Sequence, residues 1–455
     1  MPHLTAQLDM VDSTMPLRVV GQVQAISGLT IEASDLPLPL GSLCRISSFG
    51  NRQCTAEVIG FQHDHTLLMP LSPTAGVARG DVIENVASSP RIGCSEQLLG
   101  RVLDGFGRPI DGKGPINCTE YRRIDAKAVA ALSRTNIRQP ISTSVRAIDA
   151  LHTCGLGQRM GIFSGPGVGK STLMSSIARH TSADVSVVAL IGERGREVQE
   201  FIETSLGPAG MKKCVIVFST GDEPALLRVR AAKVATTVAE FFRDRGKNVL
   251  LLMDSLTRLC QAQRQIGLAA REPPTTKGFP PSVFSLLPEI LERAGKGATG
   301  SITGFYTVLV EGDDFNEPIP DAVKGITDGH LWLSRSLANR GHFPAIDVLQ
   351  SISRVRGDVC DKAQVAMARR VLQLTAVYQD IEDLVNIGAY VTGANLEYDL
   401  AVQARPKIVQ FLQQDPGTPV NLDQAKKQLS DLHAWIEQMD KVLKTQSAKP
   451  ARTAK

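Results

Sequence analysis

A glycine-rich turn followed by a lysine and a hydroxyl residue is the most chemically suggestive feature of this sequence. The turn comprises Gly165, Pro166, Gly167, Val168, Gly169, Lys170, Ser171 and Thr172. Glycines let backbone N–H groups turn inward toward a polyphosphate, and a following helix points its positive N-terminus at the same anion. We expect Lys170 to reach the outer phosphates and Ser171 to hold Mg²⁺. The turn therefore predicts that the chain binds and hydrolyses a nucleoside triphosphate.

One position departs from the general pattern of such loops, which has a glycine five residues before Gly169. Ser164 stands there instead. Serine is small, so a tight turn stays possible. A flexible surface loop rich in glycine and proline is the alternative for this stretch taken alone, and the motifs below argue against it.

Two carboxylates follow apolar runs of strand length. Asp254 ends the run 249–253, and Glu193 follows the run 185–192. Open α/β sheets place their ligands at the carboxyl ends of strands. There Asp254 would hold Mg²⁺ through water, and Glu193 would serve as the general base that activates a water molecule.

Arginines accompany these carboxylates. Arg194 follows Glu193 directly, and a guanidinium there suits the charge of a γ-phosphate. The alternative is a surface ion-pair cluster made by Glu193, Arg194, Arg196 and Glu197. Farther along, Arg354 ends the stretch Ser351-Ile-Ser-Arg354. From there it could stabilise the transition state in a neighbouring subunit, an effect of about 10³–10⁵ in rate; a plain surface arginine is the default.

The composition of the chain is that of a soluble globular protein. It has 455 residues, of which 43% are hydrophobic and 21% charged, with a net charge of +4. That length allows two or three domains, and the charge is too mild to indicate nucleic-acid binding by itself. Eight cysteines without a C-x-x-C pair predict reduced thiols in a cytosolic protein. The first ten residues lack a basic region followed by an apolar stretch, so we expect no secretory signal.

The elements that must position these residues fall into three regions. Residues 16–90 alternate apolar and polar side chains between turn residues, which predicts a small closed β-barrel. Such a barrel can bind nucleic acid, but its only aromatics are Phe49 and Phe61. Base stacking needs exposed aromatic platforms, so a structural or oligomerisation role is favoured.

Residues 91–357 alternate apolar strands with amphipathic helices, which predicts an α/β core with a parallel sheet. The expected strands are 162–163, 185–191, 214–218, 249–253, 301–310 and 330–333. Residues 358–440 read as a helical domain, with helices at 361–386, 396–414 and 423–443. Residues 441–455 hold five basic residues and no acidic one. They predict a disordered, solvated tail, with contact to a membrane surface or partner as the lesser alternative.

Several long motifs together resemble the rotary F/V-type ATPase superfamily. They are the stretches 165–172, 192–198, 253–258, 273–284 and 342–347. Over about residues 16–440 the chain is similar to the ATPases of type III protein export, and stretches 343–354 and 382–390 resemble the flagellar branch more closely than the injectisome branch. Two further departures are Ser144 and Arg271, where the family usually has glycine.

The resemblance implies an α/β fold with a RecA-like P-loop NTPase core, an N-terminal β-barrel and a C-terminal helical domain. It implies ATP and Mg²⁺ as ligands, with Lys170 and Ser171 at phosphate and metal, Asp254 as the Walker B carboxylate and Glu193 as the catalytic one. Arg354 would be a finger supplied in trans within a homohexamer. Phe343 would stack on adenine, and a plain core phenylalanine is the alternative.

Partners are also implied by the resemblance alone. They are a regulator or stator at the N-terminal segment 1–15, a central stalk protein, export substrates and chaperones at the C-terminal domain, and the membrane export gate. The location expected is cytoplasmic, peripheral to the inner membrane. The alternatives are an injectisome ATPase, a hexameric RNA-translocating motor, and a ring subunit that binds nucleotide without hydrolysing it. The motor needs aromatics that the barrel lacks, and the inert subunit should have lost Glu193 or Lys170.

Overall fold

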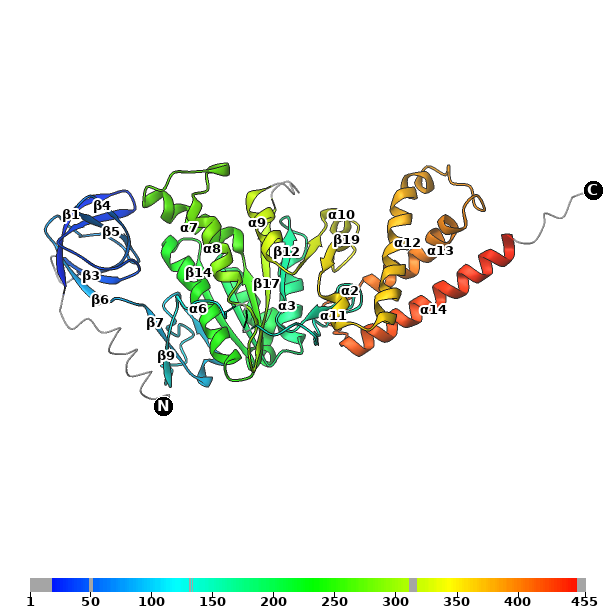
Figure 1. The fold of residues 1–455 in the computed structure, drawn as a ribbon, viewed down its shortest axis with the longest axis horizontal. Coiled ribbons are helices and arrows are strands. Elements are labelled where there is room, and N and C mark those ends of the chain that lie inside the picture. Colours follow the sequence, from blue (N-terminus) through cyan, green and yellow to red (C-terminus); the bar gives the residue numbers. More distant parts are fainter. Residues whose placement is uncertain (1–18, 49–51, 131, 133, 311–316, 448–455) are drawn as a thin grey trace, which may run out of the picture.

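The computed structural model describes residues 19–48, 52–130, 132, 134–310 and 317–447. The expected N-terminal segment 1–15, Phe49 and residues 448–455 of the expected tail lie outside this part. The described chain is elongated, with a β-barrel at one end, an α/β core in the middle and helices at the other end (Figure 1). The fold class is thus the one predicted, while the exact domain boundaries stay a prediction.

The barrel closes six antiparallel strands in the order β1-β2-β5-β4-β3-β6. The strands are β1 (Val20–Ser27), β2 (Thr30–Ser34), β3 (Leu43–Ser48), β4 (Arg52–Gln62), β5 (His65–Pro70) and β6 (Val82–Ala87). Alternate side chains such as Ile31, Ile46 and Ile83 fill the interior and are fully buried. Apolar and polar residues alternate along these strands in the sequence because successive strand residues point to opposite faces.

The core contains a nine-stranded sheet in the order β19-β18-β12-β17-β15-β13-β14-β8, with β16 paired to β17. Its strands are β8 (Val102–Leu103), β12 (Arg159–Ser164), β13 (Val185–Glu193), β14 (Cys214–Thr220), β15 (Asn248–Asp254), β16 (Gly295–Lys296), β17 (Ser301–Leu309), β18 (Gly329–Leu333) and β19 (Ile346–Ser353). Strands from β18 to β8 run parallel, but β19 is antiparallel to β18 and β16 to β17. The sheet is therefore mixed, where the sequence predicted a parallel one.

Helices cover both faces of this sheet. On one face lie α6 (Ala225–Arg243), α7 (Leu256–Ala269) and α8 (Pro281–Leu291), which share a core with alternate residues of β13. On the other lie α2 (Arg146–Leu151) and α3 (Lys170–His180), which share a core with the intervening residues of β13 and with the C-terminal helices. A strand buried on both faces is apolar throughout, as β13 is.

Shorter elements complete the core. The strand pairs are β7 (Arg91–Cys94) with β9 (Glu120–Arg123) and β10 (Pro140–Ile141) with β11 (Cys154–Gly155). The helical elements are η1 (Glu96–Leu98), α4 (Gly195–Glu200), the π-helix η3 (Phe201–Leu206), α5 (Gly207–Met211), η4 (Thr276–Gly278), α9 (Pro318–Ile326), α10 (Arg335–Asn339) and α11 (Arg356–Val359).

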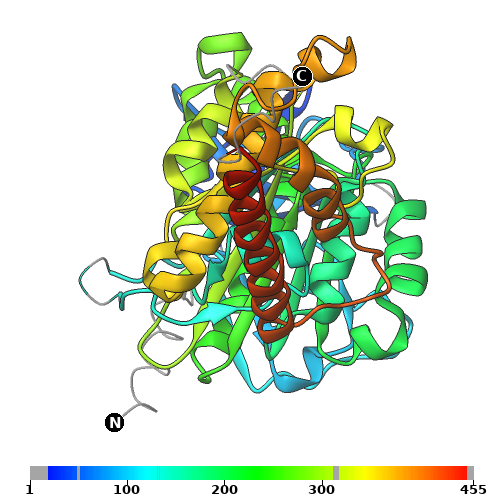
Figure 2. The same cartoon turned by 90° about the vertical axis from the view of Figure 1, so that its right-hand side faces the viewer.

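Three long helices end the described chain: α12 (Lys362–Asn386), α13 (Leu396–Leu412) and α14 (Leu422–Ser447). Figure 2, seen from this end, shows them in front of the core. The sequence predicted a disordered tail over residues 441–455. This prediction is wrong for residues 441–447, which continue α14. Leu443 packs into the core there and Lys444 pairs with Asp440 one turn earlier, so helix formation is supported beyond the predicted end. Within the described residues, no helix is long and apolar enough to cross a membrane.

Candidate active site

The glycine-rich turn joins β12 to α3, as a phosphate cradle requires. Gly167 and Gly169 have φ values of 77° and 86°, and Gly169 is the residue that precedes the first turn of α3. Only glycine adopts such left-handed conformations without strain. Ser164, by contrast, belongs to β12 and pairs with β17 and β18 as ordinary strand, so this position does not need the left-handed conformation that favours glycine.

Lys170 and Asp254 meet at the carboxyl ends of β12 and β15. The Lys170 Nζ lies 2.5 Å from the Asp254 Oδ1, and the hydroxyl of Thr307 donates to the same oxygen at 2.6 Å. Asp254 is 5% exposed. Thr307 was not found from the sequence, because only the pairing order of the strands places β17 beside β15.

Glu193 ends β13, the other neighbour of β15, and its side chain is almost fully buried. Burial, followed by the negative charge of Asp254, raises the pKa of Glu193 to about 7, against the opposing charges of Lys170 and Arg258. The Arg258 Nε lies 3.3 Å from the Glu193 Oε1. A carboxylate with a pKa near neutrality can both take up and release a proton, which is what a general base must do.

Arg194 and Arg196 are exposed, unlike the glutamate before them. The Arg194 side chain is 84% exposed and lies 3.9 Å from the Glu197 carboxylate. The cation that pairs with Glu193 is Arg258, which also donates to the carbonyl oxygen of Gly192. Within one chain, Arg194 therefore does not contact Glu193 by an ion pair, and sequence reasoning missed Arg258 although it ends the 253–258 motif.

A cavity of about 240 Å³ lies between these groups. Ser171, Glu193 and Asp254 line it, together with residues of α4 and η3. A hydroxyl and a carboxylate are oxygen ligands of the kind that Mg²⁺ prefers, and Mg²⁺ usually takes its remaining ligands from water and phosphate. Among the described residues, no three acidic, histidine or cysteine side chains cluster as a candidate metal site.

A second cavity, of about 340 Å³, lies on the other side of the turn. Its lining is mostly apolar and comprises Val145, Gly169, Thr172, Leu173, Ser176, Phe343, Pro344, Gln414, Asp415 and Pro416. The Phe343 ring is 44% exposed, and a Cβ placed on Gly169 would lie 3.5 Å from it. An aromatic ring beside the phosphate turn is well placed to stack on a nucleobase.

The connection between α13 and α14 forms one wall of this cavity, and Gln414 ties it to the core. Its backbone N–H donates to the Phe343 carbonyl oxygen at 2.9 Å. Its side-chain amide accepts from the Arg146 N–H at 2.7 Å and donates to the carbonyl oxygens of Ser144 at 2.8 Å and Thr418 at 2.9 Å. The sequence offered no signal that this loop returns to the nucleotide side of the core.

Arg354 lies apart from all of these residues. It follows β19, which runs antiparallel to β18, so Arg354 lies where β18 and β12 begin. The phosphate turn lies where β12 ends, and six strand residues at roughly 3.3 Å each separate the two ends by about 20 Å. The structure therefore brings Lys170, Ser171, Glu193, Asp254 and Phe343 around one turn, at the carboxyl ends of the parallel strands. Arg354 lies at the other end, where these strands begin.

Comparison with known proteins agrees with this arrangement. Residues 144–353 match the family model of the ATP synthase alpha/beta family, nucleotide-binding domain, and residues 360–431 match that of the T3SS EscN ATPase C-terminal domain. A flagellum-specific ATP synthase of Bacillus subtilis is 47% identical over 93% of this chain and 98% of its own. An SPI-2 type 3 secretion system ATPase of Salmonella typhimurium is 48% identical over 87% of this chain and 90% of its own.

Among solved structures, the assembled ATPase EscN of the enteropathogenic E. coli type III secretion system is similar over 91% of this chain and 100% of its own. The TM-score is 0.86 and the identity is 44%. EscN in complex with its central stalk EscO is similar at a TM-score of 0.84. Likeness of this extent covers the barrel, the core and the C-terminal helices. The chain belongs to the family of flagellum-specific and type III secretion ATPases, and it is an ATPase.

Proposed function

We propose that this ATPase works as a homohexamer and that its ATP hydrolysis powers type III protein export in flagellum assembly. It would release export substrates from their chaperones and deliver them to the export gate. Relatives named flagellum-specific ATP synthase, at 41–49% identity, support the flagellar assignment. The injectisome counterpart is the second candidate, because the solved structures of high similarity come from type III secretion systems.

The phosphates of ATP would lie on the turn from Gly165 to Ser171, with the base against Phe343. Lys170 would neutralise the outer phosphates, and Ser171 with Asp254 would hold Mg²⁺. When bound, Mg²⁺ supplies charge neutralisation on the phosphate oxygens. Lys170 already contacts Asp254, so it sits at the place where metal and phosphate charges would meet.

Glu193 would take the proton of the attacking water. Its raised pKa keeps proton transfer to the carboxylate close to balanced at neutral pH, and Arg258 holds the side chain from one side. As water attacks, the new P–O bond forms on one side of the γ-phosphorus and the bond to the leaving oxygen breaks on the other. Arg194, in the same loop, would add positive charge near the transferred group once the neighbouring subunit shields it from solvent.

The observation that most favours a shared site is the position of Arg354. The guanidinium is exposed, forms no ion pair among the described residues, and lies about a strand length from the phosphate turn of its own chain. An unpaired cation at the far edge of a subunit suits an arginine finger for the adjacent subunit.

The remaining partners are proposals of the same kind. A central stalk protein would bind the ring, as EscO binds EscN. Export substrates and chaperones would bind the C-terminal helices, a regulator or stator the segment 1–15, and the assembly would lie in the cytoplasm at the inner-membrane export gate. We expect no nucleic-acid partner: Phe61, which is 56% exposed, is the single aromatic of the barrel's described residues.

The test is the ATPase rate against protein concentration for the wild type, Glu193→Gln and Arg354→Ala, with and without added RNA. We expect the specific activity of the wild type to rise as rings form, to fall by about 10³-fold or more in both variants, and to ignore RNA. A specific activity independent of concentration and of Arg354 would contradict the shared site. Strong stimulation by RNA would favour a nucleic-acid motor instead.

A further inference from the structure

Arg354 is held by its backbone, and its side chain forms no ion pair within the part of the chain that the structure describes. Its N–H donates to the carbonyl oxygen of Asp328 at 3.0 Å, and its guanidinium Nη2 lies 3.5 Å from the carbonyl oxygen of Lys324. The backbone position from which the guanidinium extends is therefore set by the residues that fix Asp328. Those residues lie where β12 and β18 begin.

Asp328 is hydrogen-bonded to Arg159, the first residue of β12, through both its backbone and its side chain. The Asp328 N–H donates to the Arg159 carbonyl oxygen at 2.9 Å, and the Arg159 N–H donates to the Asp328 Oδ2 at 3.0 Å. The two side chains also pair as a fork, with Nε to Oδ2 and Nη2 to Oδ1 both at 3.0 Å. Two parallel charge-assisted bonds fix orientation as well as distance.

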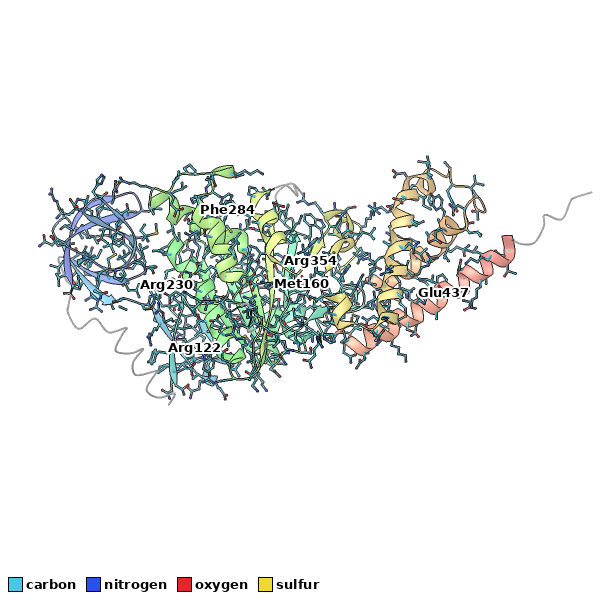
Figure 3. The ribbon with its side chains drawn as sticks, viewed as in Figure 1. Arg122, Met160, Arg230, Phe284, Arg354 and Glu437 are labelled. Carbon is cyan, nitrogen blue, oxygen red and sulfur yellow. The ribbon has the colours of Figure 1, made fainter. Side chains whose placement is uncertain are left out.

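Two further residues, Gln158 and Gly329, make the junction of β12, β18 and β19 close-packed. Gln158 is fully buried, and its amide donates to the Asp328 carbonyl oxygen at 3.2 Å and to the Ser353 hydroxyl at 3.1 Å. A Cβ on Gly329 would lie 2.5 Å from the Ile352 carbonyl oxygen and 2.8 Å from the Met160 sulfur, so β12, β18 and β19 touch without space between them. Figure 3 shows Met160 and Arg354 in this part of the core.

β12 connects this junction to the phosphate turn. Arg159 is its first residue and Ser164, directly before the turn, is its last. The strand is hydrogen-bonded to β17 on one side and β18 on the other. An extended strand paired on both sides moves as one unit with its neighbours, so its two ends cannot shift independently.

We propose that Arg159 and Asp328 are positioning residues, which hold the backbone of Arg354 in register with β12. The phosphate turn of a subunit and the arginine that it presents to its neighbour are then the two ends of one rigid strand. This proposal rests on the trans role of Arg354 in the proposed function.

A double-mutant cycle on kcat in assembled rings tests the pair. Asp328→Asn keeps the shape of the side chain and removes the charge that holds the fork. We expect kcat to fall by about 10²-fold, as a displacement of about 1 Å in a catalytic group can do, with the KM for ATP within about twofold. In the Arg354→Ala background the same substitution should change kcat by less than about twofold, because nothing is left to position.

Matched variants separate positioning from a general loss of structure. Arg134→Ala removes another ion pair of Glu292, which also contacts Arg159, but does not touch Asp328; its kcat should equal that of the wild type. Arg159→Lys keeps the charge and loses the fork, and should lower kcat by about tenfold even if Asp328→Asn does not fold.

Two outcomes would overturn the positioning role: an equal fall in kcat for Asp328→Asn with and without Arg354, or wild-type kcat in both Asp328→Asn and Arg159→Lys. If Arg354→Ala itself leaves kcat unchanged, the trans finger of the proposed function fails, and the positioning role fails with it. The cycle thus distinguishes failure of the pair from failure of the finger.

Discussion

Glu193 owes its chemical character to its surroundings at the end of β13. Burial and the charge of Asp254 raise its pKa to about 7, while Lys170 and Arg258 pull the pKa down. A carboxylic acid in this range is protonated below neutral pH and deprotonated above it. Only the deprotonated form can accept a proton from water.

The rate should therefore depend on pH with a defined sign. We expect kcat to rise as pH increases through about 7 and to level off above it, since Glu193 is a base only when ionised. Arg258→Gln removes a charge that favours the ionised form, so the midpoint should move to higher pH. The measurement is a kcat profile of assembled rings, with Arg134→Gln as the control whose midpoint stays in place, because Arg134 pairs with Glu292 and has no part in the shift of Glu193. A profile that is flat between about pH 5.5 and 8.5 would contradict the role of Glu193.

Ser144 shows how a departure from the family pattern is accommodated. Its φ of 60° lies in the left-handed region, which the family's usual glycine adopts without strain. The serine hydroxyl donates to the His180 carbonyl oxygen at 2.8 Å, and the residue is buried. Short polar side chains tolerate this conformation through such local hydrogen bonds, whereas β-branched ones do not.

Substitution at Ser144 should therefore follow backbone tolerance. Ser144→Val should lower the free energy of unfolding by about 2–4 kcal/mol, because it adds a β-branched side chain at positive φ and leaves a buried carbonyl without its donor. Ser144→Gly, the matched control, loses the same hydrogen bond but relieves the backbone, and should stay within about 1 kcal/mol of the wild type. Urea denaturation measures both, and equal destabilisation by the two would contradict the backbone argument.

Among the elements, the connection between α13 and α14 couples the C-terminal helices to the nucleotide cavity. Residues 414–416 form a wall of that cavity, and every hydrogen-bonding group of the Gln414 amide is used within the protein. The amide thus positions the wall and is not free to bind the base. The loop thus joins the C-terminal helices to the wall of the cavity by hydrogen bonds.

Gln414→Ala should loosen the wall without touching the catalytic groups. We expect the KM for ATP to rise by about tenfold, equivalent to about 1.4 kcal/mol of lost binding, with kcat within about twofold. Gln413→Ala is the control, because that neighbouring side chain is exposed and does not line the cavity. A steady-state titration of ATP measures both variants. Equal KM values for the two variants would show that the wall does not depend on Gln414.

At this scale the sequence predicts the strands with strong apolar runs and the chemistry at their ends. β12, β13 and β15 are apolar because they are buried on both faces. The turn follows β12 directly, and Glu193 and Asp254 are the last residues of β13 and β15. β19 was missed because polar residues such as Asp347, Gln350 and Ser351 interrupt its apolar run. Thr307, Arg258 and Gln414 reach the site through tertiary contacts at long sequence separation, which local patterns do not encode.

For the whole molecule, the central question is whether one active site is built from two chains. The groups proposed to bind and activate ATP gather where the parallel strands end, and Arg354, which is exposed and forms no ion pair among the described residues, lies where those strands begin. With the proposed trans role of Arg354, a subunit with this layout would present half of a site on each of two faces. Such an interface is heterologous, and repeating it closes a ring when the rotation permits.

The most direct test mixes two variants that are each inactive. Lys170→Ala disables the phosphate turn and keeps Arg354, while Arg354→Ala keeps the turn and removes the finger. If the site is shared, mixing them in equal amounts before ring assembly restores activity, because about a quarter of the interfaces in randomly mixed rings join an intact turn to an intact finger. Activity that stays at the level of the separate variants, in rings shown to contain both, would contradict a site shared between subunits.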